Sequence, residues 1–109
     1  MHELAITQSV IAAVIEHVGS SRVSRVVIEI GALTGVAPHA VRFCFDVCAK
    51  ETSLADAELE IVEVPGRMRC MDCGGEGALD SPMARCACGS FNVTLLSGRA
   101  LMIREVEVF

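Results

Sequence analysis

The sequence predicts an α+β fold in which two helices lie on one face of a small mixed sheet and a cysteine-rich lobe is inserted before the last strand. Three observations carry this prediction. Apolar residues recur at helical spacing in two segments. In other segments, β-branched residues gather or alternate with charged residues, which is typical of strands. Four of the six cysteines lie in the segment from position 70 to position 88. The 109 residues suit one ordinary domain, or a small domain that carries an insert.

The two predicted helices cover residues 4–18 and 38–50. The first carries an apolar stripe at spacings of three and four, made of Ile6, Val10, Ala13, Val14 and Val18. Gly19 follows this stripe and suits the left-handed turn that ends many helices. Pro38 suits the first position of the second helix, because its missing N–H has no helical acceptor there. The inner face of the second helix is expected to hold Val41, Phe45 or Cys44, and Cys48.

Strands are predicted over residues 22–31, 58–64, 91–96 and 101–109, with a loop at 31–37 and a turn at 52–56. In the first strand, one face is expected to hold Val26, Ile28 and Ile30, and the other Arg25, Val27 and Glu29. Turn-forming pairs stand at Pro65-Gly66 and Ser97-Gly98. These breaks predict one domain from residues 1–66 plus 98–109, and a separate lobe from residues 67–97.

The composition excludes several classes of function. Apolar residues make up 52% of the chain and charged residues 21%, which is typical of a globular protein. The net charge of −5 and the absence of Trp and Tyr argue against a nucleic-acid partner, which needs a basic face and stacking side chains. The apolar window at residues 4–18 is too short and too polar to span a bilayer. With no basic segment typical of an export signal, we expect a cytoplasmic protein.

Two cysteine pairs, Cys70 with Cys73 and Cys86 with Cys88, are separated by twelve residues rich in turn formers. Four thiolates suit tetrahedral Zn²⁺, and so small a lobe cannot be held together by apolar burial alone. The segment therefore predicts a zinc-ribbon-like lobe with a structural zinc. The single residue between Cys86 and Cys88 is one fewer than a zinc knuckle normally has, so some distortion of the site is expected.

Three other interpretations of the cysteines remain open. Disulfides need an oxidising compartment, and no export signal accompanies them. A thioredoxin-like redox pair should open a helix after a strand, whereas Gly74 and Gly75 follow Cys73 here. An iron site of the rubredoxin type is the third, since four cysteines suit iron as well.

The amino terminus, Met1-His2-Glu3, is a second candidate metal site. His2 is bulky, so Met1 should be retained with a free α-amine. That amine, the His2 imidazole and deprotonated backbone nitrogens of His2 and Glu3 form a compact chelate. Four nitrogen donors in a plane suit Ni²⁺ or Cu²⁺ better than tetrahedral Zn²⁺. An ordinary surface histidine near a frayed end is the competing interpretation.

Several motifs together resemble one known family. They are Met1-His2-Glu3-Leu4, the segment 29–33, Val36-Ala37-Pro38, Phe43-Cys44-Phe45, the segment 61–66, the cysteine pairs with Cys88-Gly89-Ser90, and the closing segment 103–108. The chain resembles the HypA/HybF family of nickel metallochaperones, which act in the maturation of nickel–iron hydrogenases. The resemblance covers nearly the whole length, and an amino-terminal Met-His-Glu combined with paired cysteines is specific to it.

The resemblance implies a nickel-binding α+β domain, a zinc-binding lobe and no catalysis. His2 matches the family's nickel ligand, with Met1 and Glu3 supplying amine and backbone nitrogen. Cys70, Cys73 and Cys88 match zinc ligands directly. The family's second pair reads Cys-Pro-x-Cys, with two residues between its cysteines. Cys86 therefore matches only if this chain has lost one residue of that spacing. Implied partners are the GTPase HypB and the hydrogenase large subunit, and a homodimer is a possible assembly.

The remaining histidines and cysteines have simpler interpretations. His39, in the first turn of the second helix, is expected to be exposed and is a weak candidate for a further nickel ligand. His17 suits the negative end of the first helix dipole. Cys44 and Cys48 are expected in the core, although their spacing could chelate a metal. The alternative function is a zinc-ribbon scaffold or adaptor without nickel transfer; an enzyme ranks third, because no nucleophile–base pair or paired carboxylates stand out.

Overall fold

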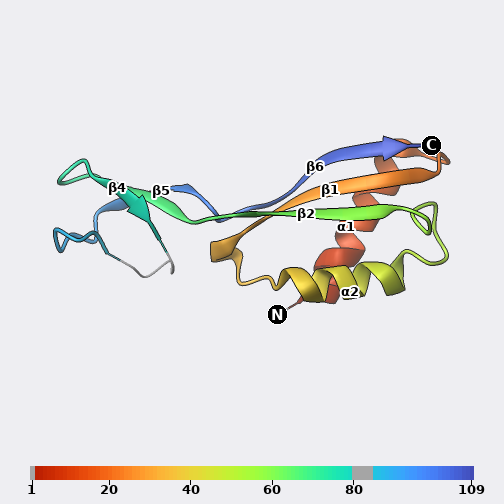
Figure 1. Ribbon diagram of the computed structural model, residues 1–109, viewed down its shortest axis with the longest axis horizontal. Coiled ribbons are helices and arrows are strands. Elements are labelled where there is room, and N and C mark those ends of the chain that lie inside the picture. The colour runs from red at the N-terminus through yellow and green to blue at the C-terminus, as the bar shows by residue number, and fades with distance from the viewer. Residues whose placement is uncertain (1, 80–84) are drawn as a thin grey trace.

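The computed structural model describes residues 2–79 and 85–109, and shows an elongated molecule with extents of 52 × 22 × 17 Å. Two helices and a three-stranded sheet form one end, and a second three-stranded sheet forms the other (Figure 1). Both helices lie on the same face of the first sheet, which is mixed. The predicted α+β fold with an inserted lobe is therefore confirmed.

The elements follow one another in an order close to the predicted one. They are α1 (Glu3–Val18), β1 (Val23–Gly31), the short 3₁₀ helix η1 (Ala32–Thr34), α2 (Pro38–Cys48), β2 (Glu58–Val64), β3 (Arg67–Cys70), β4 (Glu76–Ala78), β5 (Val93–Ser97) and β6 (Leu101–Val108). Among the described residues, no helix is both long and apolar enough to cross a bilayer.

The first sheet has the strand order β2-β1-β6, so β1 lies at its centre. β1 and β2 are parallel and are joined through α2, as parallel neighbours require a crossover. β6 returns from the lobe and pairs antiparallel with β1. The three apolar residues Val26, Ile28 and Ile30 are buried, as predicted.

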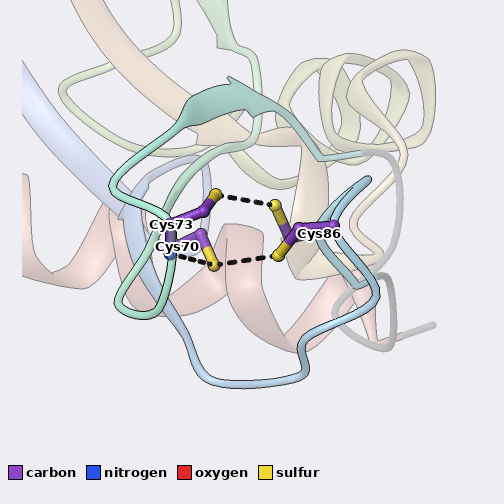
Figure 2. Close-up of side chains that lie close together, drawn as sticks. Cys70, Cys73 and Cys86 are labelled. Atoms are coloured by element: carbon purple, nitrogen blue, oxygen red, sulfur yellow. Dashed lines mark hydrogen bonds between the residues drawn. The ribbon is translucent and has the colours of Figure 1, made fainter.

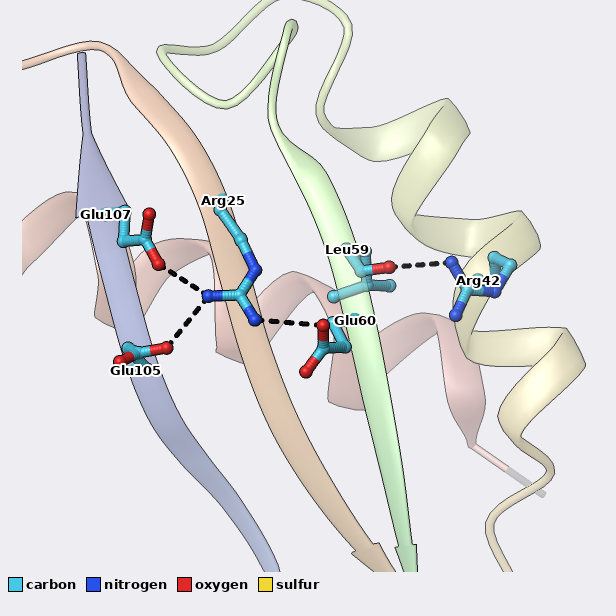
Figure 3. A network of polar contacts seen from close by, with 6 residues as sticks. All are labelled: Arg25, Arg42, Leu59, Glu60, Glu105 and Glu107. Atoms are coloured by element: carbon cyan, nitrogen blue, oxygen red, sulfur yellow. Dashed lines mark hydrogen bonds and ion pairs between the residues drawn. The ribbon is translucent and has the colours of Figure 1, made fainter.

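The sheet face without helices, called the open face below, is covered by charged side chains. Arg25 on β1 donates hydrogen bonds to Glu60 on β2, at 2.9 Å, and to Glu105 and Glu107 on β6 (Figure 3). These contacts raise the pKa of the Arg25 guanidinium, with Glu60 contributing most. Val27 faces the same side as Arg25, as predicted, because it lies opposite Glu60 and Glu105 in the two strand registers. It is only 3% exposed, because it lies on the central strand between charged neighbours on both sides.

The buried stripe of α1 differs in part from the predicted one. Its members are Thr7, Val10, Ile11 and Val14. Ala13 is exposed rather than buried, because it faces a groove between α1 and β6. The buried side of α1 is therefore turned about the helix axis relative to the predicted one. The larger Ile11 packs in the core, and Ala13 does not.

In α2, Val41 and Phe45 are buried as predicted, and the helix ends two residues before the predicted end at Lys50. Cys48 is half-buried and packs against the core, whereas Cys44 is half-buried without joining that cluster. The prediction of two core cysteines is therefore correct for Cys48 only.

The inserted lobe has the strand order β4-β3-β5, with β3 antiparallel to both neighbours. Only β5 was predicted, as residues 91–96. β3 reads Arg-Met-Arg-Cys and β4 reads Glu-Gly-Ala, and neither contains the β-branched residues that identify strands. The small core of the lobe consists of Met68, Cys70, Leu79 and Cys86, with Leu33, Val93 and Leu95 packed against it.

Three glycines meet where the chain passes between the two sheets. A Cβ atom on Gly31 would overlap the carbonyl oxygen of Gly98, and one on Gly98 would lie 2.6 Å from the Cα atom of Gly66. Gly98 also has a φ angle of 91°, which a residue with a side chain rarely adopts. The close backbone approach fixes the lobe against the sheet. The division into residues 1–66 plus 98–109 and residues 67–97 as separate folding units stays a prediction.

Candidate metal sites

The four cysteines of the lobe place their sulfur atoms in one cluster. All four Sγ atoms lie within 4.8 Å of one another, with 3.7 Å between Cys70 and Cys88 and 3.6 Å between Cys73 and Cys86. Figure 2 shows Cys70 and Cys73 facing Cys86 across the site. Four sulfurs held about 2.3 Å from one tetrahedral Zn²⁺ would be about 3.8 Å apart. The cluster therefore fits a zinc ion, and the six cysteines of the chain are free of disulfides.

Cys70 and Cys73 are positioned by a tight turn at the end of β3. The N–H of Gly74 donates to the carbonyl of Cys70 at 2.9 Å, and Gly74 has a φ angle of 75°. The N–H groups of Cys73 and Gly75 point at sulfur, the first at Cys70 and the second at Cys73, both at 3.4 Å. N–H groups directed at sulfur favour the thiolate form that a metal requires.

Cys86 and Cys88 are held by a second turn in spite of their short spacing. The N–H of Gly89 donates to the carbonyl of Cys86 at 2.8 Å, and the N–H of Cys86 donates to the carbonyl of Ser90 at 3.0 Å. Gly89 has a φ angle of 94°, so the glycine directly after Cys88 takes the sharp bend. The Cys-x-Cys pair thus brings both sulfurs to the cluster.

The two turns are linked by polar side chains for which the sequence alone predicted no role. Ser90 donates its hydroxyl hydrogen to the Asp72 carboxylate, and the Asn92 side-chain amide donates to the other carboxylate oxygen at 3.4 Å. The Asn92 N–H in turn donates to the Ser90 hydroxyl at 3.0 Å. The signal for this link is that Asp72 lies between the first two cysteines and Ser90 lies two residues after the last one.

The cluster contains thiols of different acidity. The Cys73 N–H is the largest influence on Cys70 and helps to lower the pKa of that thiol to about 6. At Cys88, the Ser90 N–H lowers the pKa, but the sulfurs of Cys86 and Cys70 outweigh it and raise the pKa to about 12. A pKa of about 6 leaves Cys70 largely a thiolate at neutral pH before metal binds, while Cys88 keeps its proton.

The amino-terminal candidate site is described from His2 onward, and Met1 lies outside the described residues. His2 is exposed and directly precedes α1, and its carbonyl accepts the hydrogen bond of the Ile6 N–H at 2.9 Å. The Glu3 carboxylate accepts a hydrogen bond from the Ala37 N–H at 3.1 Å. The start of α1 is thereby held beside the residue that precedes α2, as Figure 1 also shows.

The other two histidines, His17 and His39, lie outside the cysteine cluster. His39 is exposed, as expected, and lies in a groove with Pro38, Arg42, Ile61 and Glu63. His17 is exposed near the end of α1. Over residues 2–79 and 85–109, the four cysteines form the one cluster of three or more His, Cys, Asp or Glu side chains with metal-binding spacing.

The fold and the sulfur cluster together define a small metal-binding α+β protein with an inserted four-cysteine lobe. Residues 1–108 match the family described as "Hydrogenase/urease nickel incorporation, metallochaperone, hypA", and the chain belongs to this HypA family. The resemblance stated from the sequence motifs is therefore confirmed.

Two relatives and one solved structure agree with this assignment. The chain is 49% identical over 108 residues to "Hydrogenase maturation factor HypA" of Nostoc punctiforme, covering 99% of this chain and 96% of that protein. It is 46% identical over 109 residues to the protein of the same name from Geotalea uraniireducens, covering 99% of both. The solution structure of the nickel metallochaperone HypA from Helicobacter pylori matches with a TM-score of 0.70 at 26% identity, covering 99% of this chain and 97% of the other.

Proposed function

We propose that this chain binds Ni²⁺ at its amino terminus and delivers it for the maturation of a nickel–iron hydrogenase. The observation that carries the proposal is the placement of His2 and Glu3. The His2 imidazole is exposed just ahead of α1, and the Glu3 carboxylate is held by the Ala37 N–H. An exposed site at the end of the chain suits a cargo metal, because a recipient can reach it without unfolding the fold.

The proposed nickel ligands are the Met1 amine, the His2 imidazole and the backbone nitrogens of His2 and Glu3. The first four N–H groups of an α-helix have no intrahelical acceptor. Binding through the nitrogens of His2 and Glu3 would thus cost α1 none of its own hydrogen bonds. A plane of four nitrogens splits the d orbitals of Ni²⁺ strongly, so geometry favours nickel over zinc there.

The lobe is proposed to hold one structural Zn²⁺ through Cys70, Cys73, Cys86 and Cys88. The sulfur spacing and the N–H groups directed at sulfur support this assignment. With all four coordination positions filled by cysteine sulfurs, such a site has no open position for a substrate. Zinc there would replace the large apolar core that the lobe lacks.

The family assignment supports a role in which the protein works with other maturation proteins rather than as an enzyme. By family, the proposed partners are the GTPase HypB and the hydrogenase large subunit, in the cytoplasm. The matching family description names urease as well as hydrogenase. Because the relatives are named hydrogenase maturation factors, a hydrogenase is proposed as the recipient.

The test compares His2→Ala with His39→Ala in tag-free, zinc-loaded protein. Both histidines are exposed, but only His2 belongs to the proposed site. We expect His2→Ala to abolish nickel binding measured by calorimetry and by the d–d absorption band, and His39→Ala to leave both unchanged. Acetylation of the amino terminus should have the effect of His2→Ala. Unchanged nickel binding in His2→Ala would leave the scaffold or adaptor function as the better interpretation.

A further inference from the structure

The four sulfur atoms of the lobe divide into a buried half and an exposed half. Cys70 and Cys86 are buried in the small core of the lobe, so apolar contacts fix their positions. Cys73 and Cys88 are exposed. An exposed side chain has few neighbours to hold it in place. The exposed half of the cluster therefore depends on the contacts that fix the two cysteine turns relative to each other.

The second of these turns is one residue shorter than the first. The first closes on a hydrogen bond from the Gly74 N–H to the Cys70 carbonyl, four residues back. The second closes on a hydrogen bond from the Gly89 N–H to the Cys86 carbonyl, three residues back. In the first turn, the N–H at that three-residue position belongs to Cys73 and donates to the sulfur of Cys70. The shorter turn uses the equivalent N–H for its backbone closure, so another contact must align its sulfurs.

The Asp72 carboxylate supplies such a contact by joining the two turns. Asp72 directly precedes Cys73, and Ser90 lies two residues after Cys88. One carboxylate oxygen accepts the Ser90 hydroxyl hydrogen, and the other accepts the Asn92 side-chain amide at 3.4 Å. Hydrogen bonds to an ionised acceptor are stronger than those between neutral groups. The carboxylate thus ties the residue beside one exposed sulfur to the segment that carries the other.

The Ser90 hydroxyl is oriented by a second hydrogen bond. It accepts the Asn92 backbone N–H at 3.0 Å, so its own hydrogen is directed at Asp72. The backbone continues the link, because the Met71 N–H donates to the Asn92 carbonyl at 2.8 Å. The group formed by Asp72, Ser90 and Asn92 is called the carboxylate clamp below. It extends the pairing of β3 with β5 outward to the exposed sulfurs.

A second carboxylate of the lobe, that of Glu76, separates the role of the clamp from a simple effect of charge. Asp72 and Glu76 are both exposed. Glu76 pairs with Arg69 at 3.0 Å, and this contact stays within the hairpin of β3 and β4. An exposed ion pair of this kind contributes little to stability. Both acids place a negative charge on the lobe, but Asp72 is the one whose listed contacts reach the second cysteine turn.

We propose that the carboxylate clamp positions the exposed half of the zinc site and thereby sets the rate at which zinc is released. The inference rests on the proposed structural zinc and concerns residues beyond its four ligands. Asp72 acts through Cys73 and Cys88, which it keeps at the spacing that one tetrahedral ion requires. When the clamp is broken, Cys70 and Cys86 stay packed in the lobe core, and the two exposed sulfurs separate.

The test measures the rate of zinc loss from the full zinc-loaded chain to an excess of a chromophoric chelator. Asp72→Ala removes the acceptor of the clamp and Ser90→Ala removes its donor. Each should raise the rate about tenfold, the lower end of the range for groups that orient metal ligands. The double variant should lose zinc no faster than Asp72→Ala, because both substitutions break the same contact. Ser90→Thr keeps the hydroxyl and should release zinc as the unaltered chain does.

Cobalt in place of zinc reports the geometry of the sulfurs directly. Co²⁺ accepts the same tetrahedral set of thiolates, and its sulfur-to-metal absorption band grows with the number of thiolates bound. We expect Asp72→Ala and Ser90→Ala to weaken this band, because Cys88 moves away from the other sulfurs, and Ser90→Thr to retain it. A residue that only stabilised the fold would change the urea midpoint without changing the band of the folded protein.

The matched control is Glu76→Gln, which removes one negative charge from the lobe and leaves the clamp intact. It should change neither the rate nor the cobalt band. Asp72→Asn removes the same charge but keeps an acceptor oxygen for Ser90, so its rate should lie between those of the unaltered chain and Asp72→Ala. If Asp72→Ala fails to fold, the comparison of Asp72→Asn with Glu76→Gln decides.

Two outcomes would overturn the clamp while the zinc site stands. One is an equal rate of zinc loss in the unaltered chain, Asp72→Asn and Ser90→Ala, and the other is an equal acceleration in Glu76→Gln and Asp72→Asn. An unaltered chain that takes up no zinc would refute the zinc site itself and the clamp with it.

Discussion

The backbone N–H of Leu33 donates a 2.7 Å hydrogen bond to the carbonyl of Gly98. This bond joins the 3₁₀ turn after β1 to the point where the chain leaves the lobe, and the Leu33 side chain packs against the lobe core. The loop that carries Leu33 continues to Ala37, whose N–H holds Glu3. The two candidate metal sites are therefore built on one continuous framework.

The glycine contact at this junction gives the first prediction. A methyl group on Gly31 would overlap the Gly98 carbonyl, which is backbone and cannot rotate away. We expect Gly31→Ala to lower the free energy of unfolding by about 2 kcal/mol or more, the usual range for overpacking. Gly77→Ala is the control, since nothing lies within 4 Å of its added carbon. Urea denaturation of both variants checks the prediction. Equal free energies of unfolding would show that the backbone at the junction can shift to accept the methyl group.

The sequence predicts the parts of this fold whose residues follow a period. The burial of Val26 and Ile28 and the start of α2 at Pro38 agree with the structure, because β-branched clustering and proline geometry act locally. β3 and β4 could not be predicted, since their pairing depends on the turns that the cysteines make. Ala13 was misplaced because a stripe of spacing three and four does not fix which side of the helix meets the sheet.

The candidate sites show the same limit. The cysteine spacing indicated which four sulfurs belong together, and the structure brings these four within 4.8 Å. The bond between Ala37 and Glu3 spans 34 positions, and no local pattern in the sequence encodes it. The amino-terminal ligand set remains a prediction.

The second prediction concerns the metal of the lobe. Cys73→Ala removes one sulfur of the cluster, so we expect loss of about one Zn²⁺ per chain and loss of order over residues 68–97. The helices and the β2-β1-β6 sheet should remain folded, because their core shares no buried residue with the lobe. Metal analysis and ¹⁵N NMR measure the two effects.

Cys44→Ala serves as the control for that variant. Cys44 is a free cysteine outside the sulfur cluster, so the substitution should leave the zinc content unchanged. An ordered lobe in metal-free Cys73→Ala, or iron in the purified protein, would contradict the structural zinc assignment.

The third prediction is the number of protons released when zinc binds the apo-protein at pH 7. Cys70 has a pKa of about 6 and is mostly ionised already, whereas Cys88, at about 12, must lose its proton to the metal. The pKa of Cys73 is also raised: the Gly75 N–H lowers it, and the sulfurs of Cys86 and Cys70 outweigh that effect. We expect at least two protons but fewer than four, because metal binding displaces only bound protons.

Calorimetry in buffers of different ionisation enthalpy measures this number. Zinc affinity should fall as the pH falls, since protons compete for the thiolates, and the fall should become steeper below pH about 6, where Cys70 also gains a proton. A release of four protons at pH 7 would show that the Cys73 N–H does not hold Cys70 as a thiolate.

The last prediction distinguishes two ways in which Glu3 could bind nickel, through its backbone nitrogen or through its carboxylate. In the proposed site Glu3 supplies its backbone nitrogen, while its carboxylate accepts the hydrogen bond of the Ala37 N–H. Glu3→Ala keeps the nitrogen and removes the acceptor, so nickel should still bind, weakened by about tenfold because the segment is less well ordered before binding. Glu3→Gln keeps an acceptor oxygen and should bind more tightly than Glu3→Ala. Calorimetric titration of tag-free protein gives the affinities, with zinc content as the check that the lobe is intact. If Glu3→Ala and Glu3→Gln both lose nickel as completely as His2→Ala, then the carboxylate itself is a ligand and the planar nitrogen site is wrong.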